Sequence, residues 1–355
     1  MFKDDYKVIG VMSGTSLDGL DLAYIHFQNE NSIWRFQILK AETFSYDAKW
    51  RSILNNAFNF NSKELENLDR TYTQFLVEQI QFFINKNQIL DVDVICSHGH
   101  TILHQPENGF TLQIGNLPII ASLLNKTVVC DFRVQDVELG GQGAPLVPIG
   151  DELLFSEFDY CLNLGGFSNV SFNENGKRIA FDISPVNIVL NHFTEKIGFA
   201  YDDKGKLAQS GEINIKLLEE LNSISFYHNT FPKSLGKEFI NEKILPIIGK
   251  YDISINDVLR TFLEHIAIQI TKVVNPNTKV LITGGGAYNS FLINRLKYFK
   301  PNVDWIIPSD NLIQFKEALI FGFLGILRLR DEINVLSSVT GASQNHSSGK
   351  VFYNH

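Results

Sequence analysis

Short apolar runs separated by glycine-rich turns recur along the chain and predict buried strands. Residues 7–12 and 22–27 are two such runs, and the stretch between them, 13–19, is rich in Gly, Ser and Asp. This pattern predicts a strand, a tight turn and a second strand. The same order returns at 160–164, 165–169 and 170–172. Two halves that open alike suggest duplicated halves facing each other across a cleft, although no residue-level repeat is visible.

Longer stretches place apolar residues three to four positions apart, which is typical of helices with one buried face. Helices are predicted at 63–85, with Ser62 in the N-cap position, at 256–273, with Asn256 in the N-cap position, around 291–296, and at 315–329. Further strands are predicted at 92–96, 127–130, 178–181, 279–283 and 304–307. Strands that alternate with helices imply parallel sheet covered by helices, so the predicted fold class is α/β.

The composition indicates a globular protein of two domains. The chain has 355 residues, 44% of them hydrophobic and 20% charged, which is long enough for two domains that each bury a core. The net charge is −8 and the Lys and Arg residues are scattered, which argues against a protein that mainly binds nucleic-acid backbones. The chain start has no secretory signal pattern and no run of about 20 apolar residues occurs, so we expect a cytoplasmic protein.

Two further features bear on the organisation of the chain. The densest cluster of Gly and Pro, at 139–151, is expected to be a loop near the domain junction. Cys96, Cys130 and Cys161 are widely spaced and lie in apolar runs, where a thiol usually acts as a small buried hydrophobe. Neither a disulfide framework nor a zinc site is therefore expected.

Three turns offer backbone amides that phosphate oxygens can approach. The first contains Ser13, Gly14, Thr15, Ser16, Leu17, Asp18 and Gly19. It is not a Walker loop, because the Gly-Lys-Ser/Thr ending is missing and a strand follows. Alone it is either an ordinary hairpin turn or a phosphate turn, and a second turn with Gly165 and Gly166 favours the phosphate turn. The third, with Gly284, Gly285 and Gly286, lies between a strand and a helix, where either a nucleotide or tight packing explains the glycines.

Several polar side chains are candidates for chemistry. Asp182 follows an apolar strand and is either a general base or the cap of the following helix. Asp131 and Arg133 are either a ligand pair or an internal salt bridge, and the arginine suits a sugar carboxylate. His98, His100 and His104 lack the second ligand cluster of a zinc site, so hydrogen bonding to a polyhydroxylated ligand is the better hypothesis. The turn 233–237 is either a solvated loop or a ligand contact.

With these residues assembled, the whole chain resembles the anhydro-N-acetylmuramic acid kinases of the sugar kinase, Hsp70 and actin superfamily. Ten blocks occur in the family's order: IGVMSGTSLDGLD from Ile9, SHGHT from Ser97, TLQIGN from Thr111, DFRVQD from Asp131, GGQGAPLVP from Gly140, LNLGGFSN from Leu162, FDISPVN from Phe181, PKSLGKEF from Pro232, TGGGAYN from Thr283 and SSVTGAS from Ser337.

The resemblance implies a two-lobed actin-like ATPase fold with ribonuclease H-like lobes and a central interlobe cleft. The implied lobes are 1–130 with 338–355, and 131–337. In the family, a carboxylate activates water to attack the anomeric carbon of the 1,6-anhydro sugar, and the released oxygen takes the γ-phosphoryl group of ATP with Mg²⁺ neutralising charge. The product is N-acetylmuramic acid 6-phosphate, an intermediate in cell-wall recycling. A homodimer is also implied.

Roles for individual residues follow from the same resemblance. The carboxylate matches Asp182. The residues implied to bind ATP are those of the turn Ser13 to Gly19, together with Gly165, Gly166, Gly284, Gly285 and Gly286. The residues implied to bind the sugar are His98, His100, Thr101, Asp131, Arg133, Gln142, Gly143 and Asn187. No metal site built from protein side chains is implied.

The chain departs from the family near the chemistry. It has Asp182-Ile183-Ser184-Pro185 where the family usually has Asp-Thr-Gly-Pro, His100 where a glutamine is usual, and Gly150-Asp151 where an aromatic-histidine pair is common. Losing the glycine restricts close approach of backbone to ligand. Three other hypotheses therefore stay open: an ATP-binding regulatory protein without turnover, a kinase of a different amino sugar, and a hydrolase that works without ATP.

Overall fold

The computed structural model describes residues 3–14 and 16–354, and the chain divides into two compact units. Unit 1 contains Met1–Leu154 and Phe315–His355, and unit 2 contains Phe155–Gln314. The chain leaves unit 1 once and returns to it once. The return lies inside a long helix, at Phe315, whose backbone angles (φ −112°, ψ 15°) interrupt the helical geometry.

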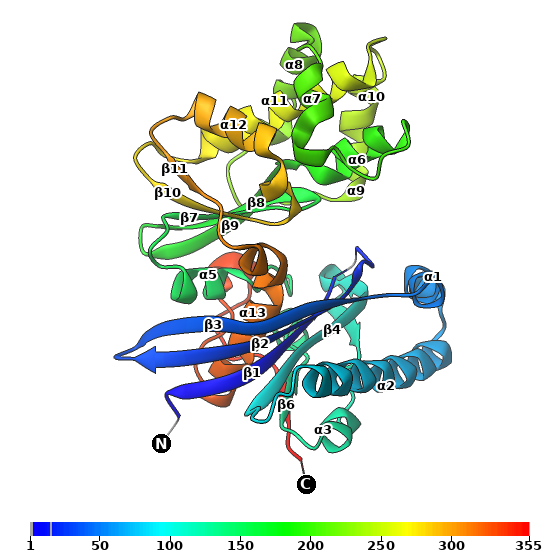
Figure 1. The fold of residues 1–355 in the computed structure, drawn as a ribbon, viewed down its shortest axis with the longest axis vertical. Coiled ribbons are helices and arrows are strands. Elements are labelled where there is room, and N and C mark those ends of the chain that lie inside the picture. Colours follow the sequence, from blue (N-terminus) through cyan, green and yellow to red (C-terminus); the bar gives the residue numbers. More distant parts are fainter. Residues whose placement is uncertain (1–2, 15, 355) are drawn as a thin grey trace. The chain divides into compact units, whose positions relative to one another are not determined.

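Within the described residues, unit 1 contains a sheet of seven strands (Figure 1). The strands are β1 Asp5–Ser13, β2 Gly19–Glu30, β3 Ile33–Ser45, β4 Val94–Gln105, β5 Phe110–Ile114, β6 Val128–Cys130 and β12 Lys350–Phe352. The order is β12-β6-β4-β1-β2-β3, with β5 beside β4. β1 is antiparallel to β2 and parallel to β4, and β4 is parallel to β6.

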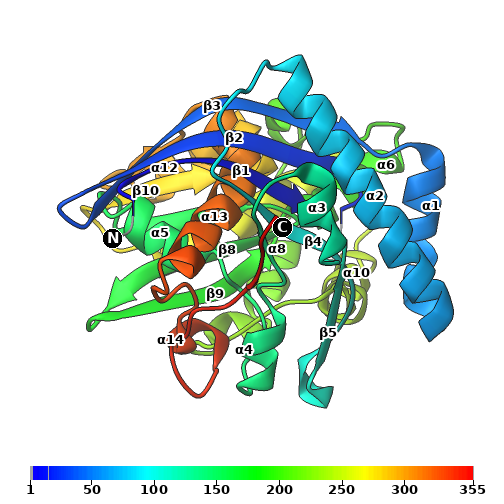
Figure 2. The ribbon, with the colours of Figure 1, turned by 90° about the horizontal axis from the view of Figure 1, so that it is seen from below.

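Helices cover both faces of this sheet. They are α1 Ala48–Asn56, α2 Ser62–Lys86, α3 Ile119–Leu124, α4 Val134–Glu138, α5 Pro148–Leu154, α13 Asp310–Leu329 and α14 Ser337–Thr340. Ile9 and Val11 of β1 lie in one apolar cluster with the buried side of α2, whereas Val8 and Gly10 face Gly322 of α13. This alternation along β1 places α2 and α13 on opposite faces, as Figures 1 and 2 show.

Unit 2 is built on a second sheet with the order β11-β10-β7-β8-β9. The strands are β7 Tyr160–Leu164, β8 Phe167–Glu174, β9 Lys177–Pro185, β10 Lys279–Thr283 and β11 Asp304–Ile306. β7 is antiparallel to β8 and parallel to β10, and β10 is parallel to β11. The helices are α6 Asn187–Glu195, α7 Lys206–Ser210, α8 Ile215–Asn222, α9 Lys237–Phe239, α10 Leu245–Ile248, α11 Ile255–Val273 and α12 Ser290–Phe299.

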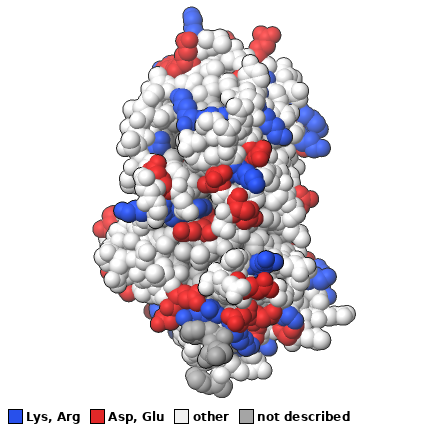
Figure 3. Space-filling view, turned by 90° about the vertical axis from the view of Figure 1, so that its left-hand side faces the viewer, with Lys and Arg blue, Asp and Glu red and all other residues white. Residues whose placement is uncertain are grey.

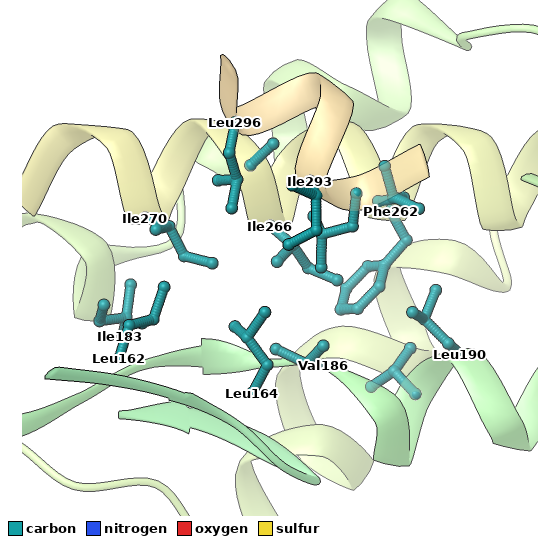
Figure 4. Close-up of a cluster of buried hydrophobic side chains, with 14 of the residues drawn as sticks. Leu162, Leu164, Ile183, Val186, Leu190, Phe262, Ile266, Ile270, Ile293 and Leu296 are labelled. Atoms are coloured by element: carbon teal, nitrogen blue, oxygen red, sulfur yellow. The ribbon is translucent and has the colours of Figure 1, made fainter. Parts of the chain in front are cut away.

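The core of unit 2 lies between its sheet and the helices α11 and α12. Leu162 and Leu164 of β7 point toward Phe262, Ile266 and the other apolar side chains of these two helices (Figure 4). A bidentate ion pair ties the helices together at the edge of this core, because the Arg295 Nε and Nη2 donate to the two oxygens of Glu264 at 2.8 and 2.5 Å.

The two units repeat one topology. In unit 1 the strands β3-β2-β1-β4-β6 lie in the order 3-2-1-4-5, and in unit 2 the strands β9-β8-β7-β10-β11 do the same. In both, the second strand is antiparallel to the first and the fourth is parallel to it. This repeated order is that of the ribonuclease H-like fold, and it confirms the α/β class and the duplicated halves predicted from the two opening turns.

Element boundaries largely follow the sequence pattern, with three corrections. The helix α2 is capped by Asn61 in a capping box with Glu64, and α11 is capped by Ser254, so neither Ser62 nor Asn256 is the N-cap. The strand predicted at 92–96 is β4, which continues to Gln105, so the polar residues 97–101 lie inside it. Several short elements, among them α6 to α10, gave no periodic signal because they are only three to nine residues long.

The unit boundaries differ from those expected. Residues 131–154 and 315–337 belong to unit 1, and the glycine-rich loop 139–147 is internal to it. Buried Asp136 anchors this loop, because its carboxylate accepts hydrogen bonds from Gly143 N–H at 2.6 Å and from the Thr340 hydroxyl at 2.7 Å. The Gly and Pro cluster therefore marks a tethered loop of unit 1, and α5 alone separates it from the passage to unit 2 after Leu154. In residues 3–14 and 16–354 no helix combines the length and apolarity needed to cross a bilayer.

Candidate functional site

The first glycine turn joins β1 to β2 in unit 1. Ser13 ends β1 and is buried, Leu17 adopts a positive φ of 60°, and Leu17 N–H donates to Gly14 O at 3.3 Å. Ser16 and Asp18 are exposed, and with Leu17 they line a hollow of about 640 Å³ that also contacts Arg51 of α1. Thr15 lies outside the described residues. A carboxylate, hydroxyls and backbone amides thus meet a solvent-filled space at this turn.

The glycines of the three turns fall into two groups. A Cβ at Gly19 would lie 2.6 Å from Phe44 O, one at Gly284 2.5 Å from Asn163 Oδ1, and one at Gly286 2.7 Å from Leu164 Cβ. Packing within each unit requires these glycines. A Cβ at Gly14, Gly166 or Gly285 would meet no atom nearer than 3.5 Å, and none of these three has a positive φ.

Glycine at Gly14, Gly166 and Gly285 is therefore not explained by the protein's own packing. Without a side chain, their backbone amides stay open to an approaching ligand, which is the need of an anion. At 284–286, packing accounts for Gly284 and Gly286, whereas Gly285 is exposed, so a ligand contact at this turn stays a prediction for Gly285.

In unit 2 the second and third turns converge on Asn187. Its backbone N–H donates to Gly165 O at 3.3 Å, and its Nδ2 donates to Leu164 O at 3.1 Å. The same side chain lies within 3.7 Å of the Cβ positions of Gly285 and Gly286. Asn187 thus links the two turns at the start of α6, and the structure brings together Gly165, Gly166 and Gly284 to Gly286.

A bulge in β4 separates two of the candidate histidines. The register between β1 and β4 pairs Val11 with Ser97 and then Ser13 with His100, so β4 holds one extra residue. Gly99 supplies it with a φ of 74°, and a Cβ there would lie 2.5 Å from Ile114 O. His100 consequently contacts Ser13 at 2.8 Å, while His98 contacts Arg133. Bulges re-aim side chains in this way beside functional sites.

Arg133, His98 and Gly143 form one hydrogen-bonded cluster in unit 1. The Arg133 Nε donates to His98 Nε2 at 2.7 Å, and its Nη1 donates to Gly143 O at 2.5 Å. Burial lowers the pKa of Arg133 to about 10, although Glu317 and Asp136 partly offset this effect. Burial, reinforced by Arg133, also holds the pKa of His98 well below its ordinary value. His98 is therefore neutral and accepts from a cationic arginine.

Three other predicted sugar contacts lie outside this cluster. Asp131 forms an ion pair with Lys350 at 2.6 Å. It is therefore part of an internal salt bridge, but its partner is Lys350 and not Arg133. Gln142 is exposed and its N–H donates to Thr340 O at 2.8 Å. Thr101 is half-buried, and its hydroxyl accepts from Gln113 Nε2 at 3.4 Å. Also in unit 1, the imidazole of His104 pairs with the Thr111 hydroxyl at 3.0 Å.

Asp182 lies near the end of β9 in unit 2 and does not cap the following helix. The helix α6 has Val186 in the N-cap position and no side-chain cap. The Asp182 carboxylate instead accepts from Leu235 N–H at 2.8 Å, and the Asp182 N–H donates to Lys233 O at 3.1 Å. The turn 233–237 is thus a clamp on Asp182, although sequence reasoning had left its role open. In the sequence, only the basic residues of this turn pointed to a ligand contact, whereas backbone atoms of the turn make the contacts with Asp182.

The environment of Asp182 favours a protonatable carboxyl. Burial raises its pKa above the ordinary value, and the single hydrogen bond from Leu235 N–H lowers it by less. Lys233 lies over the rings of Phe181 and Phe226 at 5.6 and 4.8 Å. Its ammonium group donates to Phe226 O. Among the described residues the Asp182 carboxylate thus has one hydrogen-bond donor, Leu235 N–H, and a raised pKa is what a general base requires.

The altered residue Ser184 is accommodated by a second serine. β8 and β9 pair Asn169 with Asp182 and Ser168 with Ser184, so Ile183 is the extra residue of a bulge beside Asp182. Ser184 N–H donates to Ser168 Oγ at 3.1 Å, and the two hydroxyl oxygens lie 3.1 Å apart. Both serines are fully buried. The Ser184 hydroxyl is held inside unit 2.

The departure at Gly150-Asp151 also forms an internal contact. Asp151 pairs with Lys316 at 2.6 Å, and both side chains are nearly buried. Asp151 lies in α5, three residues before Leu154, the last residue before the chain leaves unit 1, and Lys316 directly follows Phe315, where the chain returns. The pair therefore anchors both chain passages to unit 1.

Charged residues of both signs are interspersed on the face drawn in Figure 3, and no continuous basic surface appears there. Among the residues that the structure describes, no three His, Cys, Asp or Glu side chains come together as they would to hold a metal ion.

Two ribonuclease H-like units in one chain, each opening on a strand, a glycine turn and an antiparallel strand, define the class of the actin-like ATPases and sugar kinases. The model of the family described as anhydro-N-acetylmuramic acid kinase matches residues 6–354. The chain belongs to the anhydro-N-acetylmuramic acid kinase family.

Curated relatives agree with this assignment. The chain is 33% identical to the anhydro-N-acetylmuramic acid kinase of Aliivibrio fischeri over 98% of this chain and 99% of that protein. It is 34% identical to the enzyme of the same name from Pasteurella multocida over 97% and 96%. Among solved structures, component A of (R)-2-hydroxyglutaryl-CoA dehydratase from Acidaminococcus fermentans is similar over 88% of this chain and 95% of that chain. The TM-score is 0.44 and the sequence identity is 13%, so this similarity is weak.

Proposed function

We propose that this protein is an ATP-dependent kinase that opens 1,6-anhydro-N-acetylmuramic acid with water and phosphorylates it to N-acetylmuramic acid 6-phosphate, as a step in peptidoglycan recycling. The observation that carries the proposal is the position of Asp182: a carboxyl with a raised pKa, aimed by a bulge and clamped by the 233–237 turn, inside a chain of this family.

The chemistry requires a base. In the anhydro sugar, oxygen six bridges to the anomeric carbon, so no free hydroxyl is available there for phosphorylation. Asp182 takes a proton from water as the water oxygen bonds to the anomeric carbon and the bond from that carbon to oxygen six breaks. Oxygen six then bonds to the γ-phosphorus of ATP, and the bond from that phosphorus to the ADP oxygen breaks. The proton leaves Asp182 to solvent.

The glycine turns supply the phosphate contacts in this proposal. The open amides at Gly14, Gly166 and Gly285 bind phosphoryl oxygens of ATP, supported by the Ser16 hydroxyl at the first turn. Mg²⁺, when bound with ATP, would neutralise the charge that develops on the phosphoryl oxygens, and Asp18 at the first turn would be its protein ligand, since Mg²⁺ keeps several waters and needs only one or two protein carboxylates.

The cluster of Arg133, His98 and Gly143 binds the sugar. Arg133 keeps a positive charge at pH 7 and uses Nε and Nη1 internally, which leaves Nη2 for the carboxylate of the muramic acid side chain. A homodimer and a cytoplasmic location remain predictions.

We expect purified protein with ATP, Mg²⁺ and the anhydro sugar to form the 6-phosphate and ADP in equal amounts. The product is identified by mass spectrometry, with ¹⁸O-water to show that one solvent oxygen enters the sugar and none enters phosphate. Ring opening without nucleotide would instead establish a hydrolase. ATP binding without any sugar-dependent ADP release would establish a binding protein.

The pH dependence of kcat/KM for the sugar should show an acid limb above the ordinary aspartate pKa. Asp182 accepts a proton only when ionised, and burial raises its pKa above 3.8, so activity falls as pH decreases through the raised value. The profile is measured at saturating ATP and Mg²⁺. An acid limb at or below about pH 4, the ordinary aspartate range, would contradict this assignment.

A further inference from the structure

A chain of buried hydroxyl groups lies directly behind the first glycine turn, within unit 1. The Ser13 Oγ lies 2.7 Å from the Tyr46 hydroxyl and 2.8 Å from His100 Nδ1. The Tyr46 hydroxyl lies 2.6 Å from that of Tyr72. Each of the four residues is at most 2% exposed. Water therefore does not compete for these hydrogen bonds, and each proton in the chain has a definite place.

Four separate segments of the polypeptide supply this hydroxyl chain. Ser13 ends β1, Tyr46 follows β3, Tyr72 lies on α2, and His100 lies in β4 after the Gly99 bulge. The rings pack as well as bond, because the Tyr72 and Tyr46 rings lie 5.9 and 6.5 Å from the His100 ring. Packing of the rings therefore fixes the positions of the hydroxyl groups.

Counting protons sets the direction of every bond. Each hydroxyl can donate once. If His100 Nδ1 accepts, Ser13 donates to it, Tyr46 donates to Ser13 and Tyr72 donates to Tyr46, so all three protons are used. If Nδ1 donates, every bond reverses, and the buried Tyr72 proton is left facing the Ser13 hydroxyl, a neighbour with which Tyr72 forms no hydrogen bond of normal geometry. An unsatisfied buried donor is costly, so the first arrangement is preferred.

Two consequences follow for the ligand. The Ser13 proton is committed to His100, so the Ser13 side chain is not a donor to phosphate, and only its backbone remains for that role. His100 is neutral, because burial lowers its pKa to about 4, and it carries its proton on Nε2. No acceptor for Nε2 occurs among the residues that the structure describes. The His100 residue is 2% exposed, and within residues 3–14 and 16–354 this Nε2 donor has no hydrogen-bond partner.

We propose that Tyr72 and Tyr46 are positioning residues that act through Ser13 to hold His100 with Nε2–H as a donor to an anionic oxygen of the ligand. The oxygen belongs to a phosphoryl group of ATP or to the sugar carboxylate, and the identity of the ligand rests on the proposed function. The inference also accounts for the departure at position 100. A glutamine amide has one accepting oxygen and one donating nitrogen, which are the two functions that His100 provides.

Kinetic tests use the full chain with Tyr72→Phe, and with Tyr24→Phe as the matched control. Tyr24 is also buried in unit 1 and its hydroxyl donates to Asp91 O at 2.9 Å. We expect Tyr72→Phe to lower kcat/KM about 3- to 10-fold through KM, which corresponds to the loss of one hydrogen bond. A higher KM for ATP identifies a phosphoryl oxygen, and a higher KM for the sugar identifies its carboxylate. A loss no larger than in Tyr24→Phe would overturn the proposal.

A double-mutant test isolates the route through His100. In a His100→Ala background, Tyr72→Phe should have no further effect on either KM, whereas His100→Gln should retain most of the wild-type kcat/KM. Equal losses from Tyr72→Phe with and without His100 would show that the tyrosine acts only on the fold, and would overturn the proposal.

The tautomer is measured independently of activity, by ¹⁵N NMR of protein labelled at histidine, with His100→Gln to assign the signals. We expect His100 Nδ1 to be unprotonated in the wild type and to gain proton population in Tyr72→Phe. A protonated Nδ1 in the wild type would overturn the inference. If the wild type does not phosphorylate the sugar, the proposed function fails, and this spectrum still decides the inference.

Discussion

Asp182→Asn should lower kcat for sugar phosphorylation by about 10²- to 10⁴-fold, the usual contribution of a general base. The substitution preserves size, and the amide oxygen can still accept the hydrogen bond from Leu235 N–H that holds the side chain at 2.8 Å. The variant therefore loses the ability to take a proton from water while its geometry is kept. Initial rates of ADP release, coupled to detection of the 6-phosphate, measure the effect.

Two comparisons make this result specific to Asp182. Asp203→Asn changes an exposed carboxylate of the same unit that pairs with Lys206, and it should leave kcat within about twofold, because exposed pairs contribute little. The affinity of Asp182→Asn for an ATP analogue should match the wild type. An undiminished phosphorylation rate would show that another group activates the water.

The sequence predicts the fold where the pattern is regular and long. The helix α2 and the strands β7 and β10 lie within a residue of their predicted ranges, because their apolar residues repeat at one period and polar caps end them. The duplicated halves were visible for the same reason. The unit boundaries were not, because the loop 139–147 has a junction's composition but is tied down by Asp136, a contact across some 200 residues that no local pattern records.

The candidate site shows the same limit. Gly99 and Ile183 are ordinary residues in the sequence, yet each is the extra residue of a bulge that aims a neighbouring side chain. Tyr72 falls in the helix predicted at 63–85 and lies on its buried face, but its hydroxyl meets Tyr46 because a helix and a loop pack together. The sequence identifies charged residues as candidates for the site, whereas the orientation of their side chains depends on contacts between distant segments.

Gly10→Ala should be among the most destabilising single-methyl substitutions in unit 1. A Cβ at Gly10 would lie 1.9 Å from Ala318 O and 2.8 Å from Ala318 C, which are backbone atoms of α13 and cannot rotate aside. β1 and α13 must therefore separate, and overpacking of this kind costs about 3 kcal/mol. Because β1 ends at Ser13, the first glycine turn and the hydroxyl chain would shift with it. The effect appears as a lower midpoint of thermal unfolding, by roughly 6–12 °C.

Gly14→Ala provides the matched control, because it adds the same methyl group four residues along the same segment. Its nearest neighbour would be Ser16 Oγ at 3.5 Å, an ordinary van der Waals contact, and Gly14 does not have a positive φ. The thermal midpoint of Gly14→Ala should stay within about 2 °C of the wild type, since exposed substitutions that create no clash change stability by about 0.5 kcal/mol or less. A Gly10→Ala midpoint equal to that of Gly14→Ala would show that β1 and α13 do not pack at this distance. A lower midpoint for Gly10→Ala and an unchanged midpoint for Gly14→Ala would distinguish the two roles of glycine in this strand and turn. These roles are close packing at Gly10 and ligand access at Gly14.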